Sequence, residues 1–125
     1  MNSRILDYLY IAATIGFTVY GQLILKWRIR TFGPLPAAFF EKLKFLVSLL
    51  FDPAIFSGFA AAFVASLAWM AAMTKFDLNQ AYPFMSLNFV IVLILSSWLL
   101  SEPLSVQKVL GVTLIVIGTV VAARG

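Results

Sequence analysis

The chain has 125 residues, which is enough for one small domain. Hydrophobic residues make up 62% of it and charged residues 11%, whereas soluble domains are about half apolar and about a quarter charged, so a water-facing surface is excluded. The net charge of +4 is too sparse for a nucleic-acid surface, and the absence of Cys and His excludes disulfides, thiol nucleophiles, Cys/His metal sites and histidine relays.

Four apolar segments approach the length needed to cross a bilayer, about 20 mostly apolar residues. They cover residues 8–26, 54–74, 80–100 and 106–123. The predicted fold class is therefore an all-α membrane protein, with a single four-helix transmembrane domain over residues 1–125. The first segment does not resemble a cleaved signal peptide, because it runs into Lys26 and Trp27 rather than into a small-residue cleavage site.

Polar residues of the first segment recur at i, i+4 spacing, which places on one helix face Thr14, Thr18, Gln22 and Lys26. The two threonine hydroxyls either bond back to carbonyls of their own helix or face a polar path. The amide of Gln22 needs partners outside its helix. Lys26 either extends to the membrane interface or pairs with an anionic group of a substrate.

The long connection from residue 27 to residue 53 opens with Arg28 and Arg30, and its Gly33-Pro34-Leu35-Pro36 stretch cannot be helical throughout. Residues 37–51 are amphipathic, with Glu41, Lys44 and Ser48 opposite Phe40, Leu43, Val47 and Leu50. A helix with such faces tends to lie in the membrane interface. It would be either a surface anchor or a gate or lipid-contact element beside a transport path.

Short connections flank the later segments, where Asp52 and Ser105 are predicted N-caps. Because the connections after the second and third segments are short, segments two, three and four are expected to be antiparallel neighbours. Of the nine Lys and Arg residues, three (Arg4, Lys75, Arg124) lie on the side of the termini, which leaves six on the other side. This bias predicts a cytoplasmic first loop and both termini outside.

The third segment carries a group of polar and aromatic residues over less than half of its helical circumference: Tyr82, Met85, Ser86, Asn88 and Phe89. Pro83 is expected in the first turn, where proline costs little. Asn88 is the most polar residue near mid-span and is expected to face protein or a cavity. It either forms an interhelical hydrogen bond, worth about 1 kcal/mol, or contacts a substrate.

The fourth segment combines small and large residues on one helix face, as Gly111, Leu114, Ile115 and Gly118. This spacing suggests helix association, so these four residues are the candidate dimer interface.

No span has an acidic or basic residue in its middle, because the five acids, Asp7, Glu41, Asp52, Asp77 and Glu102, all fall in tails or connections. Proton-coupled cation exporters usually rely on an acid within the membrane. Hydroxyls and amides without a general base do not support catalysis. The prediction is a protein that is not an enzyme, with no catalytic residue, cofactor or metal.

Several stretches of the chain resemble the small multidrug resistance-like branch of the drug/metabolite transporter superfamily. Residues 81–90, Ala-Tyr-Pro-Phe-Met-Ser-Leu-Asn-Phe-Val, are similar to a stretch of the EamA-like aminoarabinose-phosphoundecaprenol flippase subunits. Residues 21–26 and 102–104 resemble the Gly-Gln-Leu-x-x-Lys and Glu-Pro-Val/Leu motifs of the same subunits. Residues 111–118 resemble the dimerising fourth helix of small multidrug exporters.

Two departures from the multidrug members concern their cation-exchange residues. Thr18 stands where they have a glutamate eight residues before the lysine, and Met85 stands where they have a tryptophan three residues after the tyrosine. The resemblance therefore implies the flippase group rather than the cation exchangers.

The function implied is that of a flippase or flippase subunit that moves a polyprenyl-phosphate-linked sugar or related lipid headgroup across the bacterial inner membrane. The headgroup would cross a groove lined by Thr18, Gln22, Tyr82, Ser86 and Asn88, and Lys26 would attract the phosphate. The expected partners are membrane lipid and a second subunit, as an antiparallel homodimer or paired-subunit heterodimer, and not nucleic acid. The alternatives are a small-molecule or drug exporter with an altered coupling site, and a non-transporting subunit of a glycosyltransferase complex.

Overall fold

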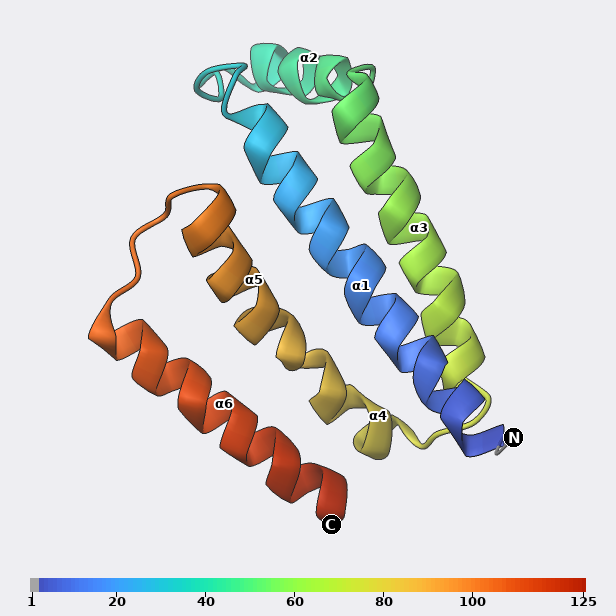
Figure 1. Ribbon diagram of the computed structural model, residues 1–125. Coiled ribbons are helices and arrows are strands. Elements are labelled where there is room, and N and C mark those ends of the chain that lie inside the picture. Colours follow the sequence, from blue (N-terminus) through green and yellow to red (C-terminus); the bar gives the residue numbers. More distant parts are fainter. Residues whose placement is uncertain (1–2) are drawn as a thin grey trace.

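The computed structural model of the protein describes residues 3–125 and contains six helices in that range (Figure 1). They are α1 (Ser3–Ile29), α2 (Phe39–Leu49), α3 (Pro53–Met73), α4 (Leu78–Met85), α5 (Leu87–Leu99) and α6 (Val106–Arg124). Four stretches are long and apolar enough to cross a membrane: Ile5–Ile29, Pro53–Met73, Leu78–Leu99 and Val106–Arg124. The predicted all-α membrane fold class is confirmed.

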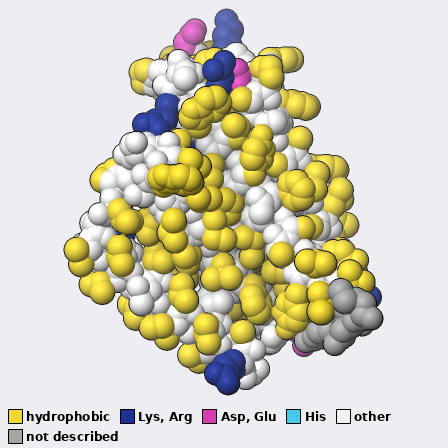
Figure 2. All heavy atoms as spheres, in the orientation of Figure 1, with side chains coloured by type: hydrophobic (Ala, Val, Ile, Leu, Met, Phe, Trp, Pro, Cys, Tyr) yellow, Lys and Arg dark blue, Asp and Glu magenta, His cyan; other side chains and the backbone are white. Residues whose placement is uncertain are grey.

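The surface is divided as a bilayer requires. Hydrophobic side chains cover the middle of the face shown in Figure 2, and Lys and Arg gather at its two ends. With 62% hydrophobic residues, the chain buries only part of its apolar surface internally, and large side chains such as Phe63 and Trp98 stay exposed. Lipid is the environment in which this exposure carries no penalty.

Helix α1 lies between α3 and α5, and α6 packs on α4 and α5 (Figure 1). The prediction that the second and third segments are neighbours is therefore wrong over most of their length, because α3 packs mainly on α1 and meets the third segment chiefly at its first part, α4. The short turn at residues 74–77 brings the ends of the two helices together but does not decide which faces pack. The small residues of α3 decide this, because they receive α1.

Gly21 of α1 and Gly58 of α3 mark the closest approach of these two helices. A Cβ added to Gly21 would lie 3.0 Å from the carbonyl oxygen of Gly58, and one added to Gly58 would lie 2.9 Å from the Ile24 Cγ2. Small residues at such a crossing let the backbones pack closely, which is a main source of helix association in lipid.

The buried cluster sits near the end of the bundle that holds the turn between α3 and α4. It is formed by Ile11, Ile15, Val19, Ala72, Phe76 and Ala81. The Tyr8 ring packs against Phe76 and Phe84, with centroid distances of 5.0 and 5.9 Å. This cluster fixes α1, α3 and α4 to one another at that end of the bundle.

The third apolar segment is broken at Ser86, between α4 and α5. The expectation that Pro83 lies in the first turn is wrong, because α4 begins at Leu78 and has Pro83 in its interior. Proline there lacks an N–H and crowds the preceding turn. The Ser86 N–H bonds to the Pro83 carbonyl at 3.1 Å and the Phe89 N–H to the Ser86 carbonyl at 3.0 Å, and these i→i+3 bonds tighten the chain at the break.

Helix α2 is part of the first loop and lies across one end of the bundle (Figure 1). Two arginines tie this loop to the spans: Arg28 Nε donates to Asp52 Oδ1 at 2.9 Å, and Arg30 Nη1 donates to the Leu100 carbonyl at 3.1 Å. The predicted N-caps are confirmed, since the Asp52 carboxylate accepts from the N–H groups of Ala54 and Ile55, and Ser105 Oγ from that of Lys108.

Candidate functional site

A cavity of about 1440 Å³ lies between α1, α3 and the α4–α5 segment. Its polar lining extends from Asn79 and Tyr82, near one end of the bundle, to Ser96 and Glu102, near the other. Apolar residues, among them Phe59 and Met70, supply much of the remaining wall. A polar path with apolar walls suits a molecule that is itself amphiphilic.

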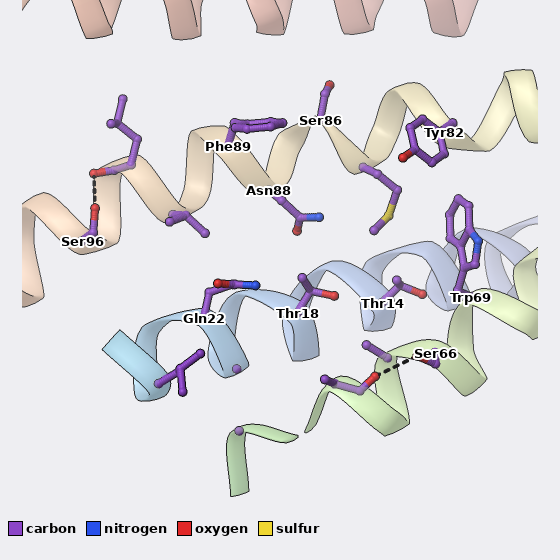
Figure 3. A pocket seen from close by; sticks show the side chains of 18 of the residues that line it. Thr14, Thr18, Gln22, Ser66, Trp69, Tyr82, Ser86, Asn88, Phe89 and Ser96 are labelled. Carbon is purple, nitrogen blue, oxygen red and sulfur yellow. Dashed lines mark hydrogen bonds between the residues drawn. The ribbon is translucent and has the colours of Figure 1, made fainter. Parts of the chain in front are cut away.

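The structure brings together five of the six predicted substrate-contacting residues. Thr18, Gln22, Tyr82, Ser86 and Asn88 all line the cavity. Lys26 does not line it and is exposed near the end of α1. The groups that face one another across the cavity are therefore neutral hydrogen-bonding groups from α1 and α5 (Figure 3).

Asn88 points from α5 toward α1, where Thr18 and Gln22 lie (Figure 3). Its Oδ1 atom is buried and has no hydrogen-bond partner among the described residues. An unpaired buried acceptor costs about 1–3 kcal/mol. The missing donor singles out Asn88 among the polar side chains of this wall.

Thr18 and Gln22 are also available, because neither side chain bonds to protein within residues 3–125. Thr14 differs from them: its hydroxyl donates to the Tyr10 carbonyl at 2.8 Å, so it follows the alternative of bonding within its own helix. Of the polar stripe on α1, the middle two residues thus offer hydrogen bonds to a guest.

Ser86 is held by protein rather than free for a guest. Its Oγ lies 2.6 Å from the Thr119 Oγ1 and donates to the Pro83 carbonyl at 2.5 Å. Thr119 of α6 is buried, and its one hydroxyl proton goes either to Ser86 or to the Ile115 carbonyl, which lies 2.8 Å away. These hydroxyls join the break in the third segment to α6, a contact that the sequence did not reveal.

At the opposite end from Glu102, Tyr82 makes an edge-on contact with Trp69 of α3, with ring centroids 6.1 Å apart. Tyr82 is 63% exposed, so the pair borders the cavity where it opens to the surroundings. Aromatic side chains with a polar tip suit a border between lipid and water.

Sequence reasoning missed several cavity residues, among them Trp69, Asn79 and Glu102, and Glu102 is the charged one. It was assigned only to a turn, yet it lines the cavity beyond the end of α5. The available signal was the Glu-Pro-Leu sequence directly after an apolar span, which holds an acid at a helix end.

The exposed face of α6 carries three of the four candidate dimer residues. Gly111, Leu114 and Gly118 are exposed, and a Cβ on either glycine would meet nothing within 4 Å. Ile115 is half-buried, on the side of Thr119. This part of α6 is unoccupied by the chain itself.

Comparison with known proteins places the chain in a family. The profile of the EamA-like transporter family matches residues 12–124. The probable 4-amino-4-deoxy-L-arabinose-phosphoundecaprenol flippase subunit ArnF of Aeromonas salmonicida is 32% identical over 115 residues, covering 90% of this chain and 76% of the relative. The corresponding subunit of Aeromonas hydrophila is 31% identical over 121 residues, covering 95% and 80%.

The second type of subunit is also similar. The probable flippase subunit ArnE of Aeromonas salmonicida is 28% identical over 113 residues, which cover 90% of this chain and 93% of the relative. No solved structure matches the chain. The resemblance inferred from the sequence motifs is confirmed, and both family and relatives indicate a transporter or flippase rather than an enzyme. This multi-pass membrane protein belongs to the EamA-like transporter family.

Proposed function

We propose that the chain is a flippase, or one subunit of a flippase, that moves the polar headgroup of a polyprenyl-phosphate-linked sugar across the bacterial inner membrane. The observation that carries the proposal is the cavity, whose polar lining is uncharged except for Glu102 at one end and includes the unpaired Asn88 acceptor. Such groups replace the water around sugar hydroxyls without placing a charge in the bilayer.

In this mechanism only the headgroup enters the cavity, and the polyprenyl tail stays in lipid. Asn88, Gln22 and Thr18 exchange hydrogen bonds with the sugar as it passes between α1 and α5. Since each bond formed replaces a bond to water, the barrier to moving the headgroup falls. The relatives named for an aminoarabinose-phosphoundecaprenol lipid support a cargo of this class.

Lys26 has a role outside the cavity. Arg28 is paired with Asp52 and Arg30 with the Leu100 carbonyl, whereas Lys26 is exposed at the same end of the bundle. Its ammonium would attract the lipid phosphate to the membrane surface. The Lys and Arg bias supports a cytoplasmic position for this end and for α2, whose exposed Phe39 and Phe40 would lie in the interface.

A second chain completes the path in this proposal. The cavity is bordered by three spans and is open to its surroundings, and Gly111, Leu114 and Gly118 of α6 form an exposed face suited to helix association. The similarity to both subunit types supports either a homodimer or a pair of different chains, in antiparallel arrangement.

The test is headgroup translocation in vesicles that contain the purified chain, alone or with its partner subunit. Asn88→Leu and Gln22→Leu should each lower the initial rate by about tenfold or more, the effect of losing one to two hydrogen bonds in a dry site. Gln107→Leu, a matched change on exposed α6 outside the cavity, should leave the rate unchanged. Normal rates in both cavity variants would contradict the proposal.

The alternative of a small-molecule exporter is favoured by one observation, the Glu102 carboxylate in a cavity that also contains Trp69 and Tyr82. Such an exporter would release protons when an organic cation is added to the purified protein. Proton release without lipid translocation would favour it over the flippase.

A further inference from the structure

The helices on the two sides of the cavity form two groups. Helices α1 and α3 pack closely on one side, and the α4–α5 segment together with α6 makes up the other. Side-chain bonds such as Arg28 to Asp52 at 2.9 Å and Ser86 to Thr119 at 2.6 Å each stay within one group. They hold a group together but do not set the distance between the two groups.

Arg30 makes a contact of the other kind, from one group to the other. Its Nη1 atom donates to the carbonyl of Leu100 at 3.1 Å. Arg30 directly follows α1 and Leu100 directly follows α5, at the end of the bundle where the first loop begins (Figure 1). At this end the cavity is lined by Leu25 of α1 and by Glu102. The contact therefore joins the two groups across one end of the cavity.

The acceptor of this contact is held in a fixed turn. The last carbonyls of a helix have no N–H partner within the helix and carry partial negative charge, so a guanidinium is a favourable donor to them. The N–H groups of Leu100 and Glu102 both bond to the Ser96 carbonyl, at 3.0 and 3.3 Å, and Ser101 between them has a left-handed φ of +56°. Arg30 thus binds a turn that moves together with α5.

The opposite end of the bundle joins the same two groups in a different way. There the Tyr8 ring of α1 packs on Phe84 of α4 at 5.9 Å, and Trp69 of α3 contacts Tyr82 at 6.1 Å. Exposing packed rings to water costs free energy. A hydrogen bond from exposed Arg30, in contrast, can be exchanged for bonds to water at a small net cost. The first-loop end is therefore the end that separates more easily.

We infer that the contact between Arg30 and Leu100 is a latch, which closes the first-loop end of the cavity and has to open before a guest enters or leaves there. When Arg30 releases the carbonyl, the end of α5 moves away from α1 and takes Glu102 with it, so the cavity opens between the two helices. The inference goes beyond the proposed function, because it concerns access to the cavity and holds for any guest.

The distance between the ends of α1 and α5 tests this inference directly. The chain has no cysteine, so spin labels attach only at introduced ones. Trp27→Cys and Trp98→Cys place a label near the end of each helix, at side chains that are 51% and 75% exposed. Electron paramagnetic resonance on the protein in lipid nanodiscs, without cargo, then gives the populations of short and long distances. The labelled chain that keeps Arg30 should show mainly the short distance.

The variant Arg30→Gln should raise the ratio of long to short distances by about tenfold, the effect of losing one charge-assisted hydrogen bond. Arg30→Lys, which keeps the charge, should restore part of the short population. Arg28→Gln is the matched control, because it removes an arginine bond that stays within the first group. It should leave the ratio unchanged.

Labels at the opposite end distinguish a latch from general loosening. The distance between Leu6→Cys on α1 and Leu78→Cys at the start of α4, both exposed positions, should not lengthen in Arg30→Gln. The inference is wrong if Arg30→Gln leaves the first-loop distance unchanged, if Arg28→Gln widens it equally, or if both ends widen together. Headgroup translocation plays no part in this measurement, so the flippase proposal can fail while the latch stands, and the reverse.

Discussion

Helices α1 and α3 meet at two glycines, whereas α6 is attached to the α4–α5 segment through the hydroxyl pair of Ser86 and Thr119 and keeps much of its surface exposed. In lipid, helices associate through close packing and polar contacts rather than through a hydrophobic drive. Close packing joins α1 to α3, and a polar contact joins α6 to the α4–α5 segment. The cavity lies between a closely packed wall, α1 with α3, and a wall that is broken at Ser86.

This difference suggests which wall moves. A helix break at a proline-containing turn is a natural hinge, whereas glycine crossings leave no room for rearrangement. We expect α5 and α6 to shift against α1 and α3 when the cavity opens alternately to the two sides.

The largest effect is expected at the glycine crossing. Gly58→Leu introduces a Cβ that would lie 2.9 Å from Ile24 Cγ2, so α1 and α3 must separate. The free energy of unfolding should fall by about 1–3 kcal/mol, the range for overpacked cores. Gly16→Leu on α1, where a Cβ meets nothing within 4 Å, should change it little. Equal losses in the two variants, measured by denaturant or thermal unfolding in detergent, would mean that the crossing is not close-packed.

A smaller effect is expected at the hydroxyl pair of the other wall. Thr119→Val removes the 2.6 Å contact with Ser86 and should lower stability by about 0.5–1.5 kcal/mol. Thr113→Val is the control, because the Thr113 hydroxyl bonds only to Val109 within exposed α6. A double-mutant cycle of Thr119→Val with Ser86→Ala should show coupling, since the two groups touch. Strict additivity would show that the hydroxyls do not join α6 to the break.

The smallest effect concerns Asp52 at the start of α3. Burial acts to raise the pKa of this carboxyl, but the N–H groups of Ile55 and Ala54 and the Arg28 guanidinium outweigh it and leave the pKa below the ordinary 3.8. A lowered folded-state pKa means that the stabilisation is complete above pH 3.8 and is lost as the pH falls through the lower value. Asp52→Asn should remove this part of the acid dependence of unfolding, and Glu41→Gln should not. An unchanged acid dependence in Asp52→Asn would contradict the assignment.

The sequence was sufficient for the fold class, the N-caps at Asp52 and Ser105, and most of the polar lining of the cavity. Hydropathy and spacing carry this information, because in a membrane each polar residue within a span must face protein or water. The i, i+4 stripe on α1 thus placed Thr18 and Gln22 correctly on the cavity side.

Other features depend on tertiary packing. The order of the helices follows from the contact between Gly21 and Gly58. The sequence around either glycine does not indicate that the two pack against each other. The helix break at Ser86 depends on where α4 begins. The predicted third segment starts at residue 80, whereas α4 starts at Leu78, and this earlier start moves Pro83 from the first turn to the helix interior. Glu102 reaches the cavity through the left-handed turn at Ser101, a backbone conformation that the residue types alone do not indicate.

The central claim is that the headgroup crosses between α1 and α5 through neutral hydrogen-bonding groups. Photocrosslinking tests it most directly, with a lipid-linked sugar that carries the photoreactive group either on the sugar or near the end of the tail. The sugar probe should label the segments around Gln22 and Asn88, and the tail probe should label lipid-facing residues instead. Labelling by the sugar probe confined to the loops at the two ends, with none in α1 or α5, would contradict it.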